Sequence, residues 1–423
     1  MTQTIGIIGT LDTKGSEIIY LKAEIERRGC RTVMIDVGVF SPPSFHPEVP
    51  AKEVAAAAGR QLEDLVARRD RGEAMEVMSK GIAVLIKERH EAGMFDGVIA
   101  MGGGGGTAIA TAAMRNLPVG FPKLLVSTLA SGNIGSYVGT TDITVMPSVV
   151  DVAGLNRVSR TIFSNAAGAI CGMVTGGRVS DASEKPLIAA TMFGNTTRAV
   201  DNARRILEQH GYEVLVFHAT GSGGRTMERL VENGYFTAVL DMTTTECADE
   251  VCGGVLSAGP TRLEAAARNG IPQVIVPGCL DMCNFWAPET VPARYKDRLF
   301  YQWNPNVTLM RTTVEENERL GEIVADKLNA ALGPITVLIP LGGFSELDYP
   351  GGPFWCPEAD QAFVDAVRKH LRPDIPVEVS DRAVNDPEFS SRAAELLLEL
   401  VNPKREQNGN VARRNAQPIP QQG

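Results

Sequence analysis

Five consecutive glycines, Gly102 to Gly106, stand between an apolar segment and a segment with helical periodicity that begins at Thr107. Glycine has no Cβ, so backbone N–H groups here can approach an anion closely, and the N-terminus of the following helix adds a partial positive charge. The segment is neither a P-loop nor the spaced GxGxxG motif. We predict phosphate binding here, with a tight structural turn as the alternative. The residues that we predict to bind phosphate are Gly102, Gly103, Gly104, Gly105, Gly106 and Thr107.

A second polar loop, GTLDTKG at 9–15, follows the first apolar segment of the chain. Lys14 could contact a phosphate as a point charge, and Asp12 could accept a hydrogen bond from a ribose hydroxyl or help to hold Mg²⁺. The alternative is a helix N-cap with a solvent-facing lysine. We assign four residues of this loop to cofactor binding: Thr10, Asp12, Thr13 and Lys14.

Small hydroxyl residues follow a further predicted strand at Ser127 and Thr128. Such residues can line a nucleotide pocket, but they are equally common as caps and turns. We include both in the predicted cofactor site, whose ligand would be a nucleotide.

Polar side chains also follow successive predicted strands in the second half of the chain. His218, Glu246 and Asp281 each come shortly after such a strand. Because the carboxyl ends of parallel strands meet at one edge of a sheet, we expect the three to converge in one pocket as catalytic residues. A lone histidine, however, is often structural. The residues that we expect to bind the substrate, with the glycines on the pocket floor, are Gly221, Ser222, Gly223, Gly224, Asn284 and Ser345.

The cysteine spacing offers a zinc interpretation that we reject. Cys247 and Cys252 are separated by four residues, Cys279 and Cys283 by three, and the pairs lie in different loops. Structural zinc sites prefer shorter spacings. A hard cation held by Glu246 and Asp281 is more credible, but we predict no metal ligands.

Alternating strands and helices predict parallel sheets with right-handed crossovers. The predicted strands are 4–10, 31–37, 97–101, 121–128 and 143–150, then 186–193, 213–218, 238–243, 273–277 and 336–341. The predicted helices are 16–28, 52–69, 71–92, 107–114, 152–165, 197–210, 226–233, 260–268, 314–331, 357–370 and 387–401.

The pattern restarts after a polar, glycine-rich stretch at 175–185, which we interpret as a linker. We therefore predict an α/β protein of two doubly wound Rossmann-like domains, 1–180 and 184–402, that face an interdomain cleft. The last 21 residues, 403–423, have almost no apolar periodicity and are expected to be disordered.

Composition excludes several classes. Hydrophobic residues make up 44% and charged residues 22%, as in globular proteins, and the net charge of −9 disfavours binding to nucleic acid. The longest apolar stretch contains the five glycines and is a poor membrane helix, so no membrane partner is expected. Seven scattered cysteines and the absence of a signal-peptide pattern favour reduced thiols and a cytoplasmic location.

Five motifs together resemble one family. They are GTLDTKG at 9–15, MGGGGGT at 101–107, VFHATGSGGRTME at 216–228, PGCLDMCNFWAP at 277–288 and FSELDYPGGPFWCPEAD at 344–360. The chain is similar over residues 4–402 to the largely uncharacterised bacterial and plant family that includes the ATP-binding inhibitory domain of the tomato mosaic virus resistance protein. The resemblance implies two Rossmann-like domains, ATP at the N-terminal one, and self-association, with a homodimer as our expectation.

Two functions follow from these patterns. The first is an enzyme that binds ATP, with Mg²⁺ as a candidate second ion, and acts on a small anionic metabolite by phosphoryl or nucleotidyl transfer. The second is a non-catalytic regulatory or protein-interaction module, in which ATP only stabilises one state of the protein.

Overall fold

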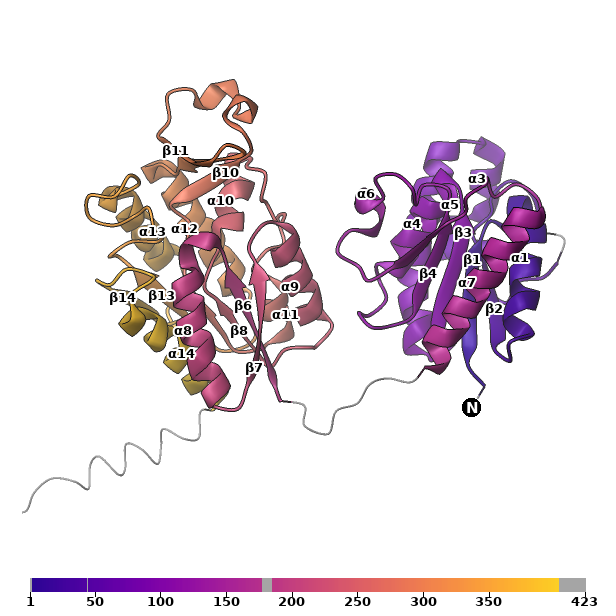
Figure 1. The fold of residues 1–423 in the computed structure, drawn as a ribbon, viewed down its shortest axis with the longest axis horizontal. Helices are drawn as coiled ribbons and strands as arrows, with labels where there is room; N and C mark the ends of the chain where they lie inside the picture. The colour runs from indigo at the N-terminus through magenta and orange to yellow at the C-terminus, as the bar shows by residue number, and fades with distance from the viewer. Residues whose placement is uncertain (1, 44, 177–184, 403–423) are drawn as a thin grey trace, which may run out of the picture. The chain divides into compact units, whose positions relative to one another are not determined.

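The computed structural model of the 423-residue chain describes residues 2–43, 45–176 and 185–402. It divides into two compact units, Met1–Asp181 and Ala182–Gly423 (Figure 1). Most of the predicted linker and the tail that we expected to be disordered lie outside the described residues. In the part of the chain that is described, no helix is both long enough and apolar enough to cross a membrane.

The first unit is a five-stranded parallel sheet with helices on both faces (Figure 1). The strand order is β2-β1-β3-β4-β5, so the chain reverses direction across the sheet at β1. The strands are β1 Thr4–Gly9, β2 Arg31–Asp36, β3 Gly97–Gly102, β4 Lys123–Ser127 and β5 Thr144–Pro147. The helices are α1 Leu11–Glu26, α2 Ala51–Ala57, α3 Leu62–Arg68, α4 Arg71–Glu91, α5 Gly104–Met114, α6 Gly135–Val138 and α7 Arg157–Thr175.

Each face of this sheet buries its own core. Alternate strand residues point to opposite faces, so Ile7 and Ile99 pack with α1 and α7, whereas Ile8 and Val98 pack with α2, α4 and α5. Neighbouring β1 and β3 are both fully buried strands, as expected in a parallel sheet covered on two sides.

Several predicted boundaries in this unit are wrong. Helix α1 begins at Leu11 after the N-cap residue Thr10, so residues 11–15 of the motif lie within the helix, with a non-helical kink at Lys14, and not in a loop that precedes it. The predicted helix 52–69 is two helices, α2 and α3. Helix α7 begins at Arg157 and not at residue 152, because Asn156 and Ser159 form an N-terminal capping box, and it continues beyond the predicted end to Thr175.

The second unit repeats this architecture. Its strands are β6 Leu187–Met192, β7 Glu213–His218, β8 Ala238–Asp241, β9 Gln273–Ile275, β10 Met282–Phe285, β11 Phe300–Asn304, β12 Val307–Arg311, β13 Ile335–Pro340 and β14 Val377–Ser380. Its helices are η1 Gly194–Thr196, α8 Thr197–Gln209, α9 Ser222–Glu232, α10 Thr245–Cys252, α11 Ala265–Asn269, η2 Pro288–Thr290, η3 Ala293–Tyr295, α12 Val314–Asn329, α13 Pro357–His370 and α14 Pro387–Val401.

The main sheet of this unit is parallel, with the order β14-β13-β9-β8-β6-β7. Read from β7, it places the second strand of the unit beside the first, then the third and the fourth, as in the first unit. The direction reverses at β6. Helices α8 and α14 cover one face, and α9, α11, α12 and α13 cover the other (Figure 1). The prediction of two doubly wound domains is therefore confirmed.

A small antiparallel sheet, β10-β12-β11, was not predicted. Its strands are short, and β11 is mostly exposed, so its sequence shows no clean alternation of apolar and polar residues. The edge strand β14 was also missed. The predicted helix 260–268 is only the short α11, which begins at Ala265.

Candidate functional site

A cavity of about 360 Å³ lies at the carboxyl ends of β1 and β3. This is where the direction of the first sheet reverses, the place at which open α/β sheets bind ligands. The lining comes from the start of α1, the segment that follows β2, the first turns of α4, the glycine run at the start of α5, and Asp151. The residues are Thr10, Asp12, Thr13, Lys14, Val37, Val39, Phe40, Arg71, Ala74, Met75, Met78, Gly102, Gly103, Gly104, Gly105, Gly106, Ile109 and Asp151.

The glycine run forms the beginning of α5 and not a separate loop. Gly103 is the N-cap residue, and Gly104 is the first helical residue. The first N–H groups of a helix have no acceptor within the helix, and no side chain caps α5. A Cβ on Gly104 would meet nothing within 4 Å, so the backbone there borders open space. An anion could therefore reach these N–H groups directly.

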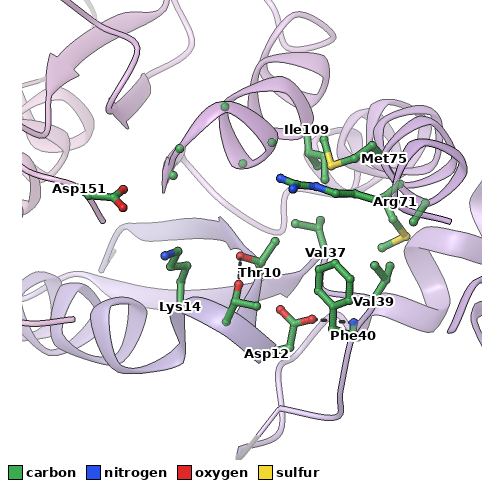
Figure 2. A pocket seen from close by; sticks show the side chains of 18 residues that line it. Thr10, Asp12, Lys14, Val37, Val39, Phe40, Arg71, Met75, Ile109 and Asp151 are labelled. Atoms are coloured by element: carbon green, nitrogen blue, oxygen red, sulfur yellow. Dashed lines mark hydrogen bonds between the residues drawn. The ribbon is translucent and has the colours of Figure 1, made fainter. Parts of the chain in front are cut away.

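The two ends of the cavity differ in polarity (Figure 2). Lys14 and Asp151 lie at one end, with the ammonium group of Lys14 also donating to the carbonyl of Val152. The guanidinium group of Arg71 reaches towards the first turn of α5. The other end is apolar, and its labelled side chains in Figure 2 are Val37, Val39, Phe40, Met75 and Ile109.

Asp12 is held by the chain but keeps an unused oxygen. Its Oδ2 accepts a hydrogen bond from the Phe40 amide at 2.8 Å. Its buried Oδ1 has no hydrogen-bond partner among the described residues. A buried acceptor without a donor is costly, and Asp12 belongs to the residues that line the cavity.

Three of the predicted cofactor residues do not line this cavity. Thr107 is fully buried, and its hydroxyl is 2.7 Å from that of Ser127, so it cannot touch a phosphate. Ser127 and Thr128 instead line a neighbouring cavity of about 370 Å³. Asp151 is the residue that the two cavities have in common.

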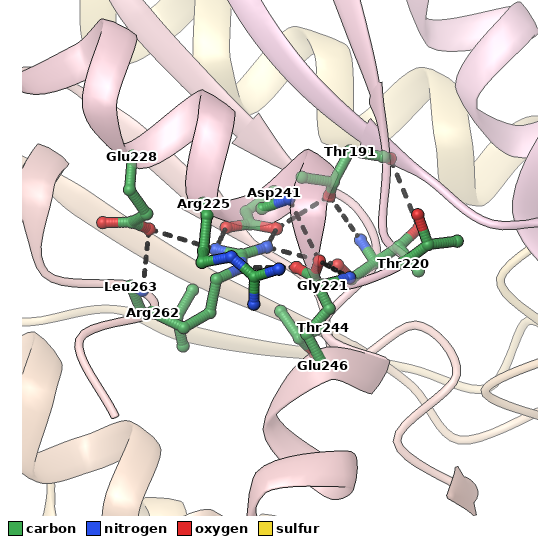
Figure 3. Close-up of polar contacts among 12 residues, drawn as sticks. Thr191, Thr220, Gly221, Arg225, Glu228, Asp241, Thr244, Glu246, Arg262 and Leu263 are labelled. Atoms are coloured by element: carbon green, nitrogen blue, oxygen red, sulfur yellow. Dashed lines mark hydrogen bonds and ion pairs between the residues drawn. The ribbon is translucent and has the colours of Figure 1, made fainter. Parts of the chain in front are cut away.

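In the second unit, Glu246 lies inside a buried charge network (Figure 3). Arg262 is 2% exposed, and its Nε donates to Glu246 Oε2 at 2.8 Å. The same guanidinium group donates to Asp241, the last residue of β8, and lies 3.3 Å from Glu228 Oε1. Burial raises the pKa of Glu228, although the charge of Arg262 opposes this. The guanidinium group of Arg262 therefore interacts with three carboxylates.

The predicted glycine loop of this unit also serves Glu246. The N–H groups of Gly221 and Gly224 donate to Glu246 Oε1 at 2.7 and 3.0 Å. A Cβ on Gly224 would overlap the same carboxylate. The N-terminus of α9 therefore already holds an anion, which is part of the protein, and the expectation that these glycines form the floor of an open pocket is wrong.

Asp281 belongs to a second buried cluster. It is fully buried, accepts a hydrogen bond from Ser345 Oγ at 2.7 Å, and lies near Arg311 and Asp348. Burial and the charge of Asp348 raise its pKa to about 7. Arg311 also pairs with Asp360 at 2.7 Å.

The three predicted catalytic residues consequently do not share a pocket. Only His218 lines a cavity, one of about 480 Å³ that also includes Ser222 and Asn284. Glu246 accepts a hydrogen bond from Arg262, and Asp281 accepts one from Ser345. Each carboxylate is buried and therefore requires hydrogen-bond donors from neighbouring residues of the second unit. Of the predicted substrate residues, Gly221, Gly223, Gly224 and Ser345 are absent from the cavity lining.

No metal centre emerges from the described residues. They contain no group of three or more His, Cys, Asp or Glu side chains that could hold a metal ion. All seven cysteines are free thiols, and burial raises the pKa of Cys247 to about 12.

Sequence reasoning missed three kinds of functional candidate. Arg71 was overlooked because it lies far along the chain from the glycine run, inside a predicted helix. Trp286 and Trp303 line the cavity of His218 and are two of only three tryptophans. Trp286 lies within the motif at 277–288 but was given no role, and Trp303 lies outside the five motifs. Arg262 was missed because nothing local marks an arginine for burial.

The fold and the first cavity define a class: a protein of two doubly wound, Rossmann-like α/β domains with a ligand cavity at the switch point of the first sheet. The chain belongs to the uncharacterised protein family UPF0261, whose N-terminal domain matches residues 3–178 and whose C-terminal domain matches residues 185–401.

Named relatives agree with this membership. A UPF0261 protein of Clostridium tetani is 50% identical over 402 residues, which are 95% of this chain and 100% of that protein. The ToMV resistance protein Tm-1(GCR237) of Solanum lycopersicum is 38% identical over 94% of this chain, which corresponds to 55% of the tomato protein. A solved UDP-N-acetylglucosamine 2-epimerase from Rickettsia bellii aligns over 96% of this chain and 98% of its own, at 10% identity and with a TM-score of only 0.22.

Proposed function

We propose that the first unit binds ATP in the cavity between β1, β3 and the start of α5. The observation that carries this proposal is the uncapped first turn of α5, which borders open space at Gly104 and faces a cavity flanked by Lys14 and Arg71. A helix N-terminus with nearby cations suits a polyphosphate.

The polarity of the cavity suggests how the nucleotide lies. The adenine ring fits the apolar end near Val37, Phe40 and Met75, and the phosphates fit the end with Lys14. The unpaired Oδ1 of Asp12 would accept a hydrogen bond from ribose. If Mg²⁺ accompanies ATP, the carboxylate of Asp151 at the phosphate end is its candidate ligand, since Mg²⁺ in such sites takes one or two carboxylates plus phosphate oxygens.

The proposed consequence of binding is phosphoryl or nucleotidyl transfer, in which positioning and charge neutralisation contribute most of the catalysis. The burial and internal pairing of Glu246 and Asp281 favour the second candidate, a regulatory module without turnover, because two expected catalytic groups face no open cavity. The anionic nature of a second ligand and the homodimer both stay predictions; light scattering on the purified chain tests the latter.

Calorimetric titration of the full chain with ATP, ADP and AMP, with and without Mg²⁺, tests the proposal. We expect saturable binding that weakens as phosphates are removed. Absence of ATP binding would contradict it. Phosphate or pyrophosphate release measured in the same samples then separates an enzyme from a regulatory module.

A further inference from the structure

The cavity of His218 lies in the second unit, between the carboxyl ends of β6 and β7 and the small antiparallel sheet. Its volume of about 480 Å³ is within the range of small-molecule sites. The lining is Phe193, Gly194, Asn195, His218, Thr220, Ser222, Val255, Leu256, Asn284, Phe285, Trp286, Trp303, Asn304, Val307 and Leu309.

Aromatic rings form much of the wall. Trp286 and Trp303 are 51% and 43% exposed, which is unusual for the largest apolar side chain, and both line this one cavity. Phe193 and His218 stack on each other with ring centroids 5.6 Å apart. Indole faces carry negative charge density and attract cations.

Two buried amide groups in the lining have oxygens that accept no hydrogen bond from the described residues: Oδ1 of Asn195 and Oδ1 of Asn284. The orientation of Asn284 follows from Thr245, whose hydroxyl donates to the carbonyl of Met282 at 3.2 Å and therefore accepts from Asn284 Nδ2 at 3.1 Å, so the other amide atom of Asn284 is the oxygen. Asn195 Nδ2 lies 3.6 Å from the sulfur of Met282.

The side chains that line the cavity limit the charge of its ligand. Among the described residues, no lysine, arginine, aspartate or glutamate lines the cavity. An anionic ligand would therefore find no fixed positive partner, and the polar groups that lack partners are acceptors, which need donors. A ligand with N–H donors, a positive charge and an apolar skeleton meets both conditions.

We propose that this cavity binds an organic ammonium ion. Its N–H groups donate to the amide oxygens of Asn195 and Asn284, and its charge and carbon skeleton lie against the indole rings of Trp286 and Trp303. The inference goes beyond ATP binding and is independent of it, because every residue that carries it lies in the second unit. For this cavity it replaces the anionic metabolite that the sequence led us to expect.

Three probes of matched shape and different charge test the proposal: cyclohexylammonium, cyclohexanol and cyclohexanecarboxylate. Each is titrated into the full chain, with tryptophan fluorescence and calorimetry as readouts. We expect cyclohexylammonium to bind about tenfold more tightly than cyclohexanol, in line with a desolvated cation–π contact, and cyclohexanecarboxylate to bind most weakly. Equal affinities for ammonium and alcohol, or preference for the carboxylate, would overturn the proposal.

Substitutions in the cavity lining test whether cyclohexylammonium binds there. Trp303→Leu should lower the affinity for cyclohexylammonium severalfold, whereas Trp355→Leu, at the third tryptophan and outside the cavity lining, should not. Asn195→Leu removes one acceptor and should reduce the preference for ammonium over alcohol. If neither cavity variant changes binding, the probe binds elsewhere and the proposal is wrong. Gly104→Asp should leave probe binding unchanged, which separates this test from that of ATP binding.

Discussion

The side chain of Arg262 donates from Nε to Oε2 of Glu246 at 2.8 Å, and neither side chain is more than 2% exposed. Glu246 lies in the first turn of α10, the helix that follows the third strand of the second unit. In the first unit the corresponding helix is α5, which begins with glycines beside an open cavity. The start of the helix after the third strand therefore differs between two sheets of the same strand order. In the first unit it borders an open cavity, and in the second unit a buried ion pair fills this place.

Glu246→Gln should destabilise the second unit by about 3 kcal/mol, because an amide N–H₂ must then face either Arg262 or the glycine N–H groups, and the buried Arg262 loses one of its three carboxylate partners. Urea unfolding followed by circular dichroism measures the change. Glu250→Gln, at an exposed position on the same helix, is the matched control and should be neutral. Unchanged stability of Glu246→Gln would contradict the structural role inferred here.

Gly104→Asp should abolish ATP binding. The position has room for a side chain, so the fold should persist, but the carboxylate would lie where the phosphates are expected and would repel them. Gly172→Asp is the control, since a Cβ there also meets nothing within 4 Å and the residue is exposed on α7. Calorimetry should show ATP binding by the control alone. ATP binding by both variants would exclude the glycine site.

Arg71→Ala and Lys14→Ala should each weaken ATP more than AMP, because both cations are expected near the outer phosphates. A loss of about tenfold for ATP corresponds to about 1.4 kcal/mol. Lys87→Ala, a solvent-exposed change on the same helix as Arg71, should have no effect. An equal loss of affinity for ATP and AMP would show that the altered residue does not contact the outer phosphates.

Stability should fall as the pH rises from about 4 to about 7. Burial raises the pKa of Asp249 to about 7, so between its unfolded value of 3.8 and that pH the native state holds a proton that the unfolded chain releases. Asp281 shifts the same way. The slope is at most about 1.4 kcal/mol per pH unit for each group. Asp249→Asn should reduce the slope measured by urea unfolding at several pH values; a slope of opposite sign in the wild type would contradict the assignment.

Much of the fold could be predicted because its signals are local. Buried strands such as 4–9 and 97–102 are short apolar runs, and helix ends are marked by residues such as Gly29 and Gly211. The repetition of this pattern predicted two domains of one type. The antiparallel sheet could not be predicted in the same way, because β11 is exposed and its pairing with β12 depends on contacts within the folded unit.

The sequence by itself determined which residues stand at the carboxyl ends of the strands: Lys14, Gly104, His218, Glu246 and Asp281 all follow from strand positions. Only the tertiary structure decided where their side chains point. Glu246 turns inward because Arg262 and the N–H groups of Gly221 and Gly224 supply donors to its carboxylate. Asp281 receives a hydrogen bond from Ser345, which is distant in sequence, and its Oδ1 has no partner among the described residues. Lys14 and Gly104 border a cavity because no described side chain of the first unit fills that space.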